Sequence, residues 1–347
     1  MKVPHERFII QRQAQEQLQA RRWSQAEASF RQLLELDAQD EEALQGRAIA
    51  LDALGQFDTL YEVAEQLLSA NLASASGLAF KARALQKLER LSEATIANDQ
   101  ALLLDTNLGL AWINRSGLQL LQQKYPEALR SSLRATQLAS DDARAWANKG
   151  MALFNTNALF EALDAFTTSL EKDPGFLLAL QMRGEIFLRL GRLEAGIANA
   201  NQTLEIQPLD LTALTQAAQA TRALERFEEL QEVSQTLLQI VPESFFAWEH
   251  FMRSQRALGQ FDQALEALNQ MLALDGRNVR LWTLKADTLY RLSRYREAVA
   301  AGSQALQLEP DFPPAIRIHE KSLKLMYQRK ERRPKSSNPN FNPNFNP

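Results

Sequence analysis

The sequence predicts an all-α solenoid of nine 34-residue helix-turn-helix repeats, followed by a capping helix. Three observations support this fold class: turn-forming residues recur every 34 positions, each interval contains two amphipathic helical patterns, and small residues recur at two fixed places. A solenoid grows by stacking neighbouring units. The 347 residues therefore need no division into the two or three domains that this length would suggest.

Proline marks the period of the repeat. Pro174, Pro208 and Pro242 lie 34 residues apart, and Pro310 lies two further periods along the chain. Proline ends a helix because it lacks the backbone N–H and clashes with the preceding turn. Extending this phase in both directions places the nine repeat starts at Arg7, Glu41, Ala75, Gly109, Ala143, Leu177, Leu211, Phe245 and Val279.

The repeat beginning at Ala143 illustrates the helix pair. Trp146 and Leu153 have helical spacing in its first half, as do Leu159 and Phe166 in its second. Residues 155–157, Asn-Thr-Asn, provide a turn between the two helices. No segment alternates polar and apolar residues with a period of two, so no strand is predicted.

Small residues at two fixed positions predict close packing of the paired helices. The eighth position is almost always alanine, glycine or serine, and the twentieth is small in seven repeats. Leu60 and Leu230 are the large residues at the twentieth position, so looser packing is expected in the second and seventh repeats. The seventeenth position carries a bulky residue in every repeat: Trp23, Phe57, Leu91, Tyr125, Leu159, Leu193, Phe227, Phe261 and Tyr295.

Together these positions resemble the tetratricopeptide repeat family over residues 7–310. The resemblance includes the tryptophan or leucine at the fourth position, the small residues at the eighth and twentieth, the aromatic at the seventeenth and the proline between units. It implies a right-handed superhelix in which the first helix of each repeat lines a concave groove. The fold of such a solenoid does not by itself identify a partner.

The ends of the chain differ from the repeats. Residues 1–6 are predicted to be a flexible N-terminus, residues 7–312 the solenoid, and residues 313–330 the capping helix, with Ile316, Leu323 and Met326 as its apolar stripe. Residues 331–347 contain a basic run and an Asn-Pro-Phe-rich sequence, which predicts a disordered tail.

Composition limits the classes of function. The net charge of −3 argues against nucleic acid as the main partner, and the absence of cysteine excludes thiolate metal sites and cysteine nucleophiles. No segment is long and apolar enough to span a membrane, and residues 1–22 lack a signal-peptide core, so the expected location is the cytoplasm.

No catalytic or cofactor-binding constellation stands out, so the chain is not expected to be an enzyme. The three histidines, His5, His250 and His319, are far apart in the sequence, and no phosphate-binding loop is present. Acidic pairs such as Asp141-Asp142 lie at repeat starts, where capping of a helix is the simpler interpretation. The recurring tryptophans are interpreted as core residues because they keep the 34-residue period.

Polar residues on the predicted groove face are the candidate binding residues. Asparagine presents a paired donor and acceptor to a peptide backbone, although a solvated polar face is an equally good interpretation for Asn114 and Asn148. The resemblance to peptide-binding family members supports the first reading. The full candidate set is Arg83, Asn114, Arg144, Asn148, Arg189, Gln216, Gln219, Arg222, His250, Arg253, Arg256, Arg280 and Arg291.

Two classes of function remain open. In the first, the chain is a protein-interaction adaptor that holds a peptide or helix of a partner protein in its groove, with an acidic segment suited to the arginines of the C-terminal half. In the second, it is an assembly scaffold that acts through its convex faces or self-association, which leaves a homo-oligomer open. RNA recognition by a helical repeat is set aside because the chain before Asp311 is acidic.

Overall fold

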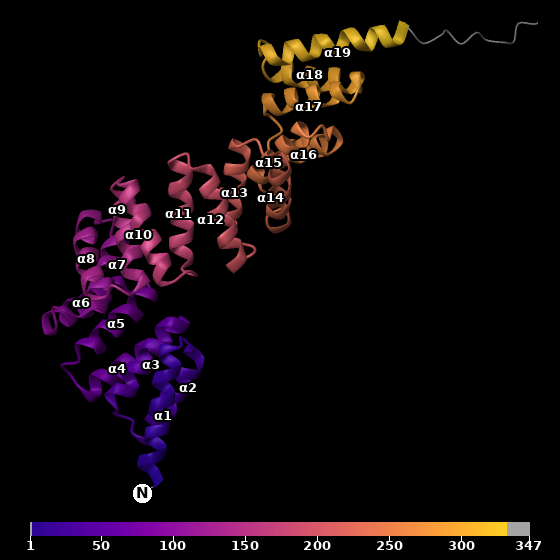
Figure 1. The fold of residues 1–347 in the computed structure, drawn as a ribbon. Helices are drawn as coiled ribbons and strands as arrows, with labels where there is room; N and C mark the ends of the chain where they lie inside the picture. Colours follow the sequence, from indigo (N-terminus) through magenta and orange to yellow (C-terminus); the bar gives the residue numbers. More distant parts are fainter. Residues whose placement is uncertain (1, 332–347) are drawn as a thin grey trace, which may run out of the picture. The chain divides into compact units, whose positions relative to one another are not determined.

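The computed structural model describes residues 2–331, which form nineteen α-helices and contain no β-strand (Figure 1). The predicted all-α repeat fold with a C-terminal capping helix is therefore confirmed. In chain order the helices are α1 (Lys2–Gln19), α2 (Trp23–Leu36), α3 (Glu41–Leu54), α4 (Phe57–Ala70), α5 (Ala75–Lys87), α6 (Leu91–Leu104), α7 (Gly109–Leu121), α8 (Tyr125–Leu138), α9 (Ala143–Asn155), α10 (Leu159–Lys172), α11 (Leu177–Arg189), α12 (Leu193–Ile206), α13 (Leu211–Ala223), α14 (Phe227–Ile240), α15 (Phe245–Ala257), α16 (Phe261–Leu274), α17 (Val279–Arg291), α18 (Tyr295–Leu308) and α19 (Pro313–Glu331).

The helix boundaries follow the 34-residue period. The first helices of repeats two to nine begin at the residues that the proline phase predicts, from Glu41 to Val279, and every second helix begins at the bulky seventeenth position. The exception is α1, which begins at Lys2, so the backbone of residues 2–6 is helical where a flexible N-terminus was expected. The predicted tail from residue 332 onward lies outside the described residues.

Each repeat turns between its two helices through one residue with a left-handed backbone. Glycine occupies this place at Gly55, Gly191 and Gly259, where a positive φ costs nothing. The other six repeats use residues with a side chain, and their φ values lie between 55° and 63°. These residues are Arg21, Glu89, Gln123, Asn157, Glu225 and Ser293.

Side-chain caps begin most of the first helices. The Asp40 carboxylate accepts from the Ala43 N–H at 3.1 Å, and the Asp142 carboxylate accepts from the Arg144 N–H at 2.9 Å. Asp142 therefore acts as the predicted cap, whereas its neighbour Asp141 pairs with Lys172 at 3.0 Å. Such caps satisfy the N–H groups that the first turn leaves unbonded.

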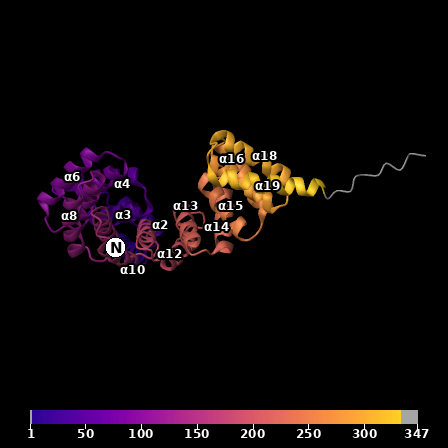
Figure 2. The same ribbon diagram turned by 90° about the horizontal axis from the view of Figure 1, so that it is seen from above.

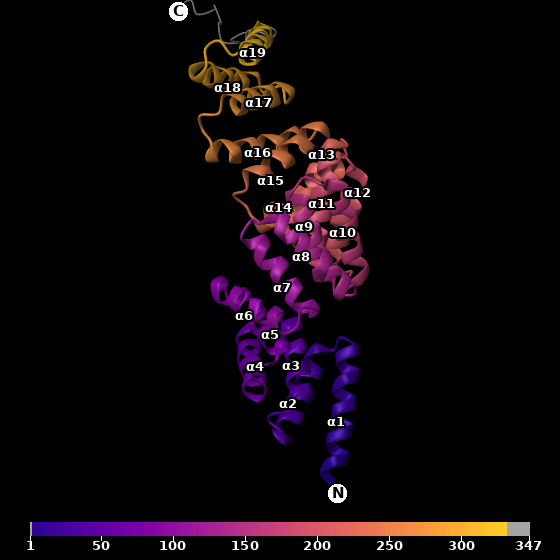
Figure 3. The same cartoon turned by 90° about the vertical axis from the view of Figure 1, so that its left-hand side faces the viewer.

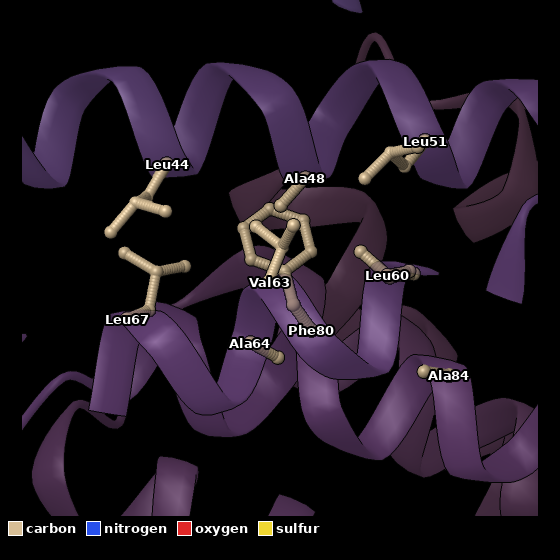
Figure 4. Close-up of a cluster of buried hydrophobic side chains, with 9 residues drawn as sticks. All are labelled: Leu44, Ala48, Leu51, Leu60, Val63, Ala64, Leu67, Phe80 and Ala84. Atoms are coloured by element: carbon tan, nitrogen blue, oxygen red, sulfur yellow. The ribbon is translucent and has the colours of Figure 1, made fainter. Parts of the chain in front are cut away.

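Packing between large and small residues forms the core. Figure 4 shows Ala48 of α3 opposite Leu60 and Val63 of α4, with Phe80 of α5 close behind them. The looser packing expected in repeats two and seven is confirmed, because α3 with α4 and α13 with α14 approach each other at fewer places than the helix pairs of repeats one, three, four, five, eight and nine. Leu60 and Leu230 are themselves fully buried, at 0% exposure. Ala48 beside Leu60 keeps the total volume balanced, and burial of one leucine stabilises the fold by about 1.5–3 kcal/mol.

The chain divides into two compact units within α11. Unit 1 extends to Ile186 and unit 2 begins at Phe187. The helices of unit 1 follow one another around a curve (Figure 2), and its two ends meet where the Arg21 Nη2 donates to the Lys172 carbonyl oxygen at 3.1 Å. This contact joins residues 151 positions apart, so unit 1 closes on itself.

In unit 2 the last helix covers the ninth repeat. Helix α19 packs against α18 and α17, and the three form successive layers (Figure 3). Its buried face consists of Ala315, Ile318 and Ser322, and it is displaced from the predicted stripe of Ile316, Leu323 and Met326, which are only half-buried. The Cβ of His319 lies against Gly302 of α18, where a residue larger than glycine would leave too little space.

Candidate functional site

The recurring tryptophans are structural. Trp112 donates its indole N–H to the carbonyl oxygen of Thr106, and Trp146, Trp248 and Trp282 make the same bond to the residue six positions earlier, at 2.8–2.9 Å. Each tryptophan therefore ties the start of a first helix to the turn before it. Its repeated bond agrees with the interpretation of these residues as part of the repeat rather than a ligand site.

Two candidate groove residues of unit 1 are bound to a carboxylate of the same unit. Asp52 of α3 accepts from the Arg83 Nε of α5 at 2.8 Å, and its other oxygen pairs with the Arg144 guanidinium of α9. Arg144 is also held by Asp142 at 2.7 Å. The Asp52–Arg144 pair joins positions 92 residues apart, so a cross-groove clasp of Asp52, Arg83 and Arg144 spans the concave side of unit 1.

The charge balance of this clasp is set by the two arginines. Burial by itself raises the pKa of Asp52, but the attraction of Arg144 and Arg83 and their hydrogen bonds bring it below its usual value. Burial and the nearby Arg83 lower the pKa of Lys87, which Asp52 partly opposes. Asp52 is therefore ionised at neutral pH, and its removal would leave three cations facing one another.

The two candidate asparagines lie between repeats rather than on the groove surface. Asn114 is only 1% exposed, and its Nδ2 donates to the Ala79 carbonyl oxygen at 2.8 Å. The Nδ2 of Asn148 donates to the Ile113 carbonyl at 3.0 Å and to the Ser116 hydroxyl at 2.8 Å. Each amide thus bonds the first helix of the preceding repeat, which corrects the interpretation of Asn114 as a surface group for a bound peptide.

Gln216 and His250 of unit 2 are also interior residues, at 4% and 3% exposure. The His250 Nδ1 lies 2.8 Å from the Phe246 carbonyl oxygen, and the two rings stack with centroids 4.0 Å apart. Burial lowers the pKa of His250, so its ring is neutral at pH 7. Gln219, three residues after Gln216 on α13, is exposed.

Two adjoining hollows lie on the first-helix side of unit 2. One, of about 610 Å³, lies between α13, α15 and α17, and the other, of about 320 Å³, between α15, α17 and α19. They share Arg256 and Leu284. We call this surface the unit 2 groove; its charged lining residues are Arg222, Glu225, Arg253, Arg256, Asp287, Arg317 and Lys321.

Three of the candidate arginines form ion pairs within unit 2. Arg253 pairs with Glu249 on its own helix at 2.8 Å, and Arg256 and Arg291 both pair with Asp287, at 2.5 and 3.1 Å. Burial lowers the pKa of Arg256, and the attraction of Asp287 partly offsets this effect. Arg256 therefore has a structural role as well as a place in the groove.

Other cations on this side are more available. Arg222 and Lys321 line the hollows, and neither has a carboxylate within ion-pair distance in the described part of the chain. Arg280 is exposed on the first turn of α17 and likewise has no such partner among residues 7–328. Arg189, at the exposed end of α11, lies outside the two hollows and is not counted among these cations.

Asp52 is the residue that the candidate list lacked. It occupies the twelfth position of the second repeat, which the helical spacing assigns to the groove face. Its arginine partners were recognised there, but Arg144 lies three repeats away, and sequence periodicity does not reveal contacts across a groove. Among the described residues, there is no cluster of three or more potential metal ligands and no helix that qualifies as a membrane span.

The comparison with known families agrees with this architecture. A family model described as tetratricopeptide repeat matches residues 118–176 and 252–313, which include parts of both units. These two segments are therefore tetratricopeptide repeats. Both matched segments extend from one helix pair into the next, in phase with the 34-residue repeat. A search of the curated proteins finds no match to the sequence.

A search of the solved structures finds chains that are similar to this one at low sequence identity. The Pseudomonas aeruginosa pilF structure is 16% identical, with a TM-score of 0.53 over 61% of this chain and 98% of that one. The Cut9–Hcn1 structure of the APC/C is 16% identical over 87% of this chain, with a TM-score of 0.47, and this chain spans 52% of its length. YrrB, described as having an unusual peptide-binding site, is 22% identical over 53% of this chain and 95% of its own, with a TM-score of 0.37.

Proposed function

We propose that this chain is a non-catalytic adaptor whose unit 2 groove binds an acidic peptide or helix of a partner protein. The proposal rests on the lining of the two adjoining hollows, which carries five cationic side chains against two acidic ones. The whole chain has a net charge of −3, so this surface is a local exception. Such a surface steers ligands of opposite charge towards it.

The apolar part of the groove favours a ligand that is not purely polar. The larger hollow is also lined by the apolar residues Met252, Leu284, Ala223 and Ala257. A hollow of about 610 Å³ has room for a large apolar side chain. An acidic segment with one such anchor would gain affinity from its burial and orientation from the arginines.

The unit 1 groove is a less suitable site for an acidic ligand, because its arginines are already paired within the unit. In unit 1, Asp52 already provides the carboxylate that Arg83 and Arg144 bind. A ligand would have to displace an intramolecular partner, which has a high effective concentration. Arg222 and Lys321 of unit 2 have no carboxylate partner among the described residues, so a ligand that binds them displaces none.

A defined probe tests the proposal. An acidic amphipathic peptide of glutamate, aspartate and leucine should bind the full chain, and the double change Arg222→Glu and Lys321→Glu should weaken its binding at least tenfold. These positions are preferable to Arg256, whose reversal would place a second carboxylate beside Asp287. Arg277→Glu with Arg296→Glu is the matched control, because both side chains are exposed in unit 2 but lie outside the hollows. Equal binding by both double variants would refute the proposal.

The alternative is an assembly scaffold that acts through second helices. Ile96 and Leu103 on α6 are 60% and 83% exposed, and their spacing of seven places them on one face of the helix. An exposed apolar face of this kind favours contact with another protein surface. Loss of partner capture on Ile96→Lys with Leu103→Lys, with capture retained by the unit 2 charge-reversal variant, would favour this function.

A further inference from the structure

A cation at the seventh position of one repeat can pair with an acidic residue on the second helix of the repeat before it. Lys81 of α5 pairs with Glu65 of α4 at 2.6 Å, and Arg115 of α7 pairs with Asp99 of α6 at 3.1 Å. Both acidic residues occupy the twenty-fifth position of their repeats. In repeats three and four, the carboxylate of the preceding repeat thus neutralises the cation at the seventh position.

Repeat nine has the cation without the carboxylate. Its seventh position is Lys285 of α17, and the twenty-fifth position of the preceding repeat is Asn269 of α16. The Lys285 Nζ lies 5.0 Å from the centroid of the Trp282 ring, and no carboxylate lies within ion-pair distance of it among residues 7–328. Burial lowers the pKa of Lys285, and the attraction of Glu297 opposes this only in part. A further carboxylate beside Lys285 would offset the cost of burying its charge, since an opposite charge favours the ammonium form.

A hollow of about 320 Å³ lies beside this lysine, between α16, α17 and α18. Its floor is apolar, with the buried residues Leu265, Leu289 and Ala301. The half-buried ring of Trp282 also lines it, and the bond from its indole N–H to the Gly276 carbonyl oxygen holds this ring in place. The volume is at the small end of ligand sites, which measure roughly 300–1,000 Å³. The lining residues all differ from those of the unit 2 groove, so this hollow is a separate site.

The charges around the hollow leave one positive charge in excess. Its charged lining residues are Lys285, Arg294 and Glu297. Both carboxylate oxygens of Glu297 accept from Arg294, at 2.8 and 2.6 Å, so these two charges balance each other. Asn269 and Gln304 also line the hollow, and their amides can donate to an anion. A ligand with a single negative charge therefore suits the site.

We propose that this hollow binds a small monocarboxylate with an apolar body, such as an alkanoate of medium length. The ligand carboxylate lies beside Lys285, in the place that Glu65 and Asp99 occupy in the earlier repeats. Its apolar body packs against Trp282 and Leu265. A neutral ligand would leave the charge of Lys285 uncompensated, and a very short one would leave the apolar floor in contact with water.

Repeat five provides a matched control within the same chain. Lys149 occupies its seventh position, and the Lys149 Nζ lies 5.0 Å from the centroid of the Trp146 ring, as Lys285 does from its own tryptophan. The twenty-fifth position of the preceding repeat is Leu133, which is 42% exposed. A leucine side chain offers an anion no hydrogen bond, so hexanoate is expected to leave this cation–ring pair unaffected.

The test follows the indole N–H signals of the full chain by NMR during a titration with hexanoate. The Trp282 signal, assigned with Trp282→Phe, should shift in a saturable manner, whereas the Trp146 signal should stay unchanged. Hexanamide has the same apolar body without the charge, and propionate has the charge on a shorter body. Each should need at least a tenfold higher concentration for half-saturation.

Two variants remove the positive charge that the ligand needs. Lys285→Met deletes the cation, and Asn269→Asp restores the carboxylate found in repeats three and four. Each should raise the half-saturating hexanoate concentration at least tenfold. Leu133→Asp makes the equivalent change beside Lys149 and should leave hexanoate binding unchanged. Asn269 is exposed, so Asn269→Asp keeps the test decisive if Lys285→Met fails to fold.

Three results would overturn the proposal. If the Trp282 and Trp146 signals shift together, or neither shifts, the hollow is not a specific site for the carboxylate. If hexanamide or propionate binds as tightly as hexanoate, the charge or the apolar floor contributes nothing, and the propionate result would instead favour an acidic side chain of a partner protein. If Asn269→Asp binds hexanoate as the wild type does, the missing carboxylate is not the reason for binding.

Discussion

Removal of the Asp52 carboxylate tests whether the cross-groove clasp holds unit 1 together. Asp52→Asn keeps the shape of the side chain and removes its charge. The Asp52 side chain is 7% exposed, and the side chains of Arg83 and Arg144 are 15% and 27% exposed. Removing one member of a buried ion pair costs about 3–5 kcal/mol, and partial exposure of the arginines reduces the expected loss to about 2–3 kcal/mol. The repulsion between Arg83, Arg144 and Lys87 contributes to this loss.

Two measurements test the expected loss of stability. Urea unfolding of the full chain reports the change in the free energy of unfolding, and hydrogen exchange resolved by segment reports which helices lose stability. Amides of α3, α5 and α9 should exchange faster, with no change in α13–α18 of unit 2. Glu93→Gln is the control, because its ion pair with Arg90 is exposed, at 56% and 44%, and solvent screening should make its loss much smaller than that of the clasp. If Asp52→Asn costs no more than Glu93→Gln, the clasp does not stabilise unit 1.

Three further predictions concern the repeat itself and its buried histidine. Gly191→Ala should destabilise the chain by about 1 kcal/mol through its φ of +67° alone, because no atom lies within 4 Å of an added Cβ. Glu225→Gly should stabilise the chain by about 0.5–1 kcal/mol. If urea melts show the same change in the free energy of unfolding for both variants, the left-handed turns are contradicted. Ala162→Leu, at a fully buried position, should cost about 1–3 kcal/mol, whereas Gln219→Ala should stay within about 0.5 kcal/mol. Because the pKa of His250 is lowered in the folded chain, the unfolded chain takes up the proton first as the pH falls through about 6.5. The wild type should therefore lose more free energy of unfolding than His250→Gln between pH 7 and pH 5. Parallel pH profiles of the two chains would contradict this prediction.

Sequence periodicity predicted the repeats because each helix pair repeats the same local chemistry. The seventeenth-position residues from Trp23 to Tyr295 each begin a second helix, since a bulky side chain beside small ones has one way to pack. The left-handed turns were missed because only Gly55, Gly191 and Gly259 carry the usual signal. The stripe predicted on α19 is wrong although the helix begins at Pro313 as predicted, because its buried face contains the small residues Ala315 and Ser322 beside Ile318 rather than the large apolar ones.

The candidate site was predictable only in part. The cationic character of the C-terminal half follows from the sequence, and Arg222, Arg253 and Arg256 do line the unit 2 groove. Helical spacing does not distinguish a groove surface from the junction between repeats, so it predicts exposure for Asn114 and His250, which are buried. The Asp52–Arg144 pair depends on how strongly unit 1 curves, a property of many small packing angles rather than of any one motif.

A charge-swap experiment tests the central claim most directly. The affinity of the full chain for an acidic amphipathic peptide is measured beside that of the Arg222→Glu and Lys321→Glu variant, and then both chains are measured with a peptide in which lysine replaces each acidic residue. If the unit 2 groove binds the acidic segment, the wild type prefers the acidic peptide at least tenfold and the variant prefers the basic one, with both preferences declining as salt increases. A variant that keeps the wild-type preference would contradict the assignment of partner binding to this groove.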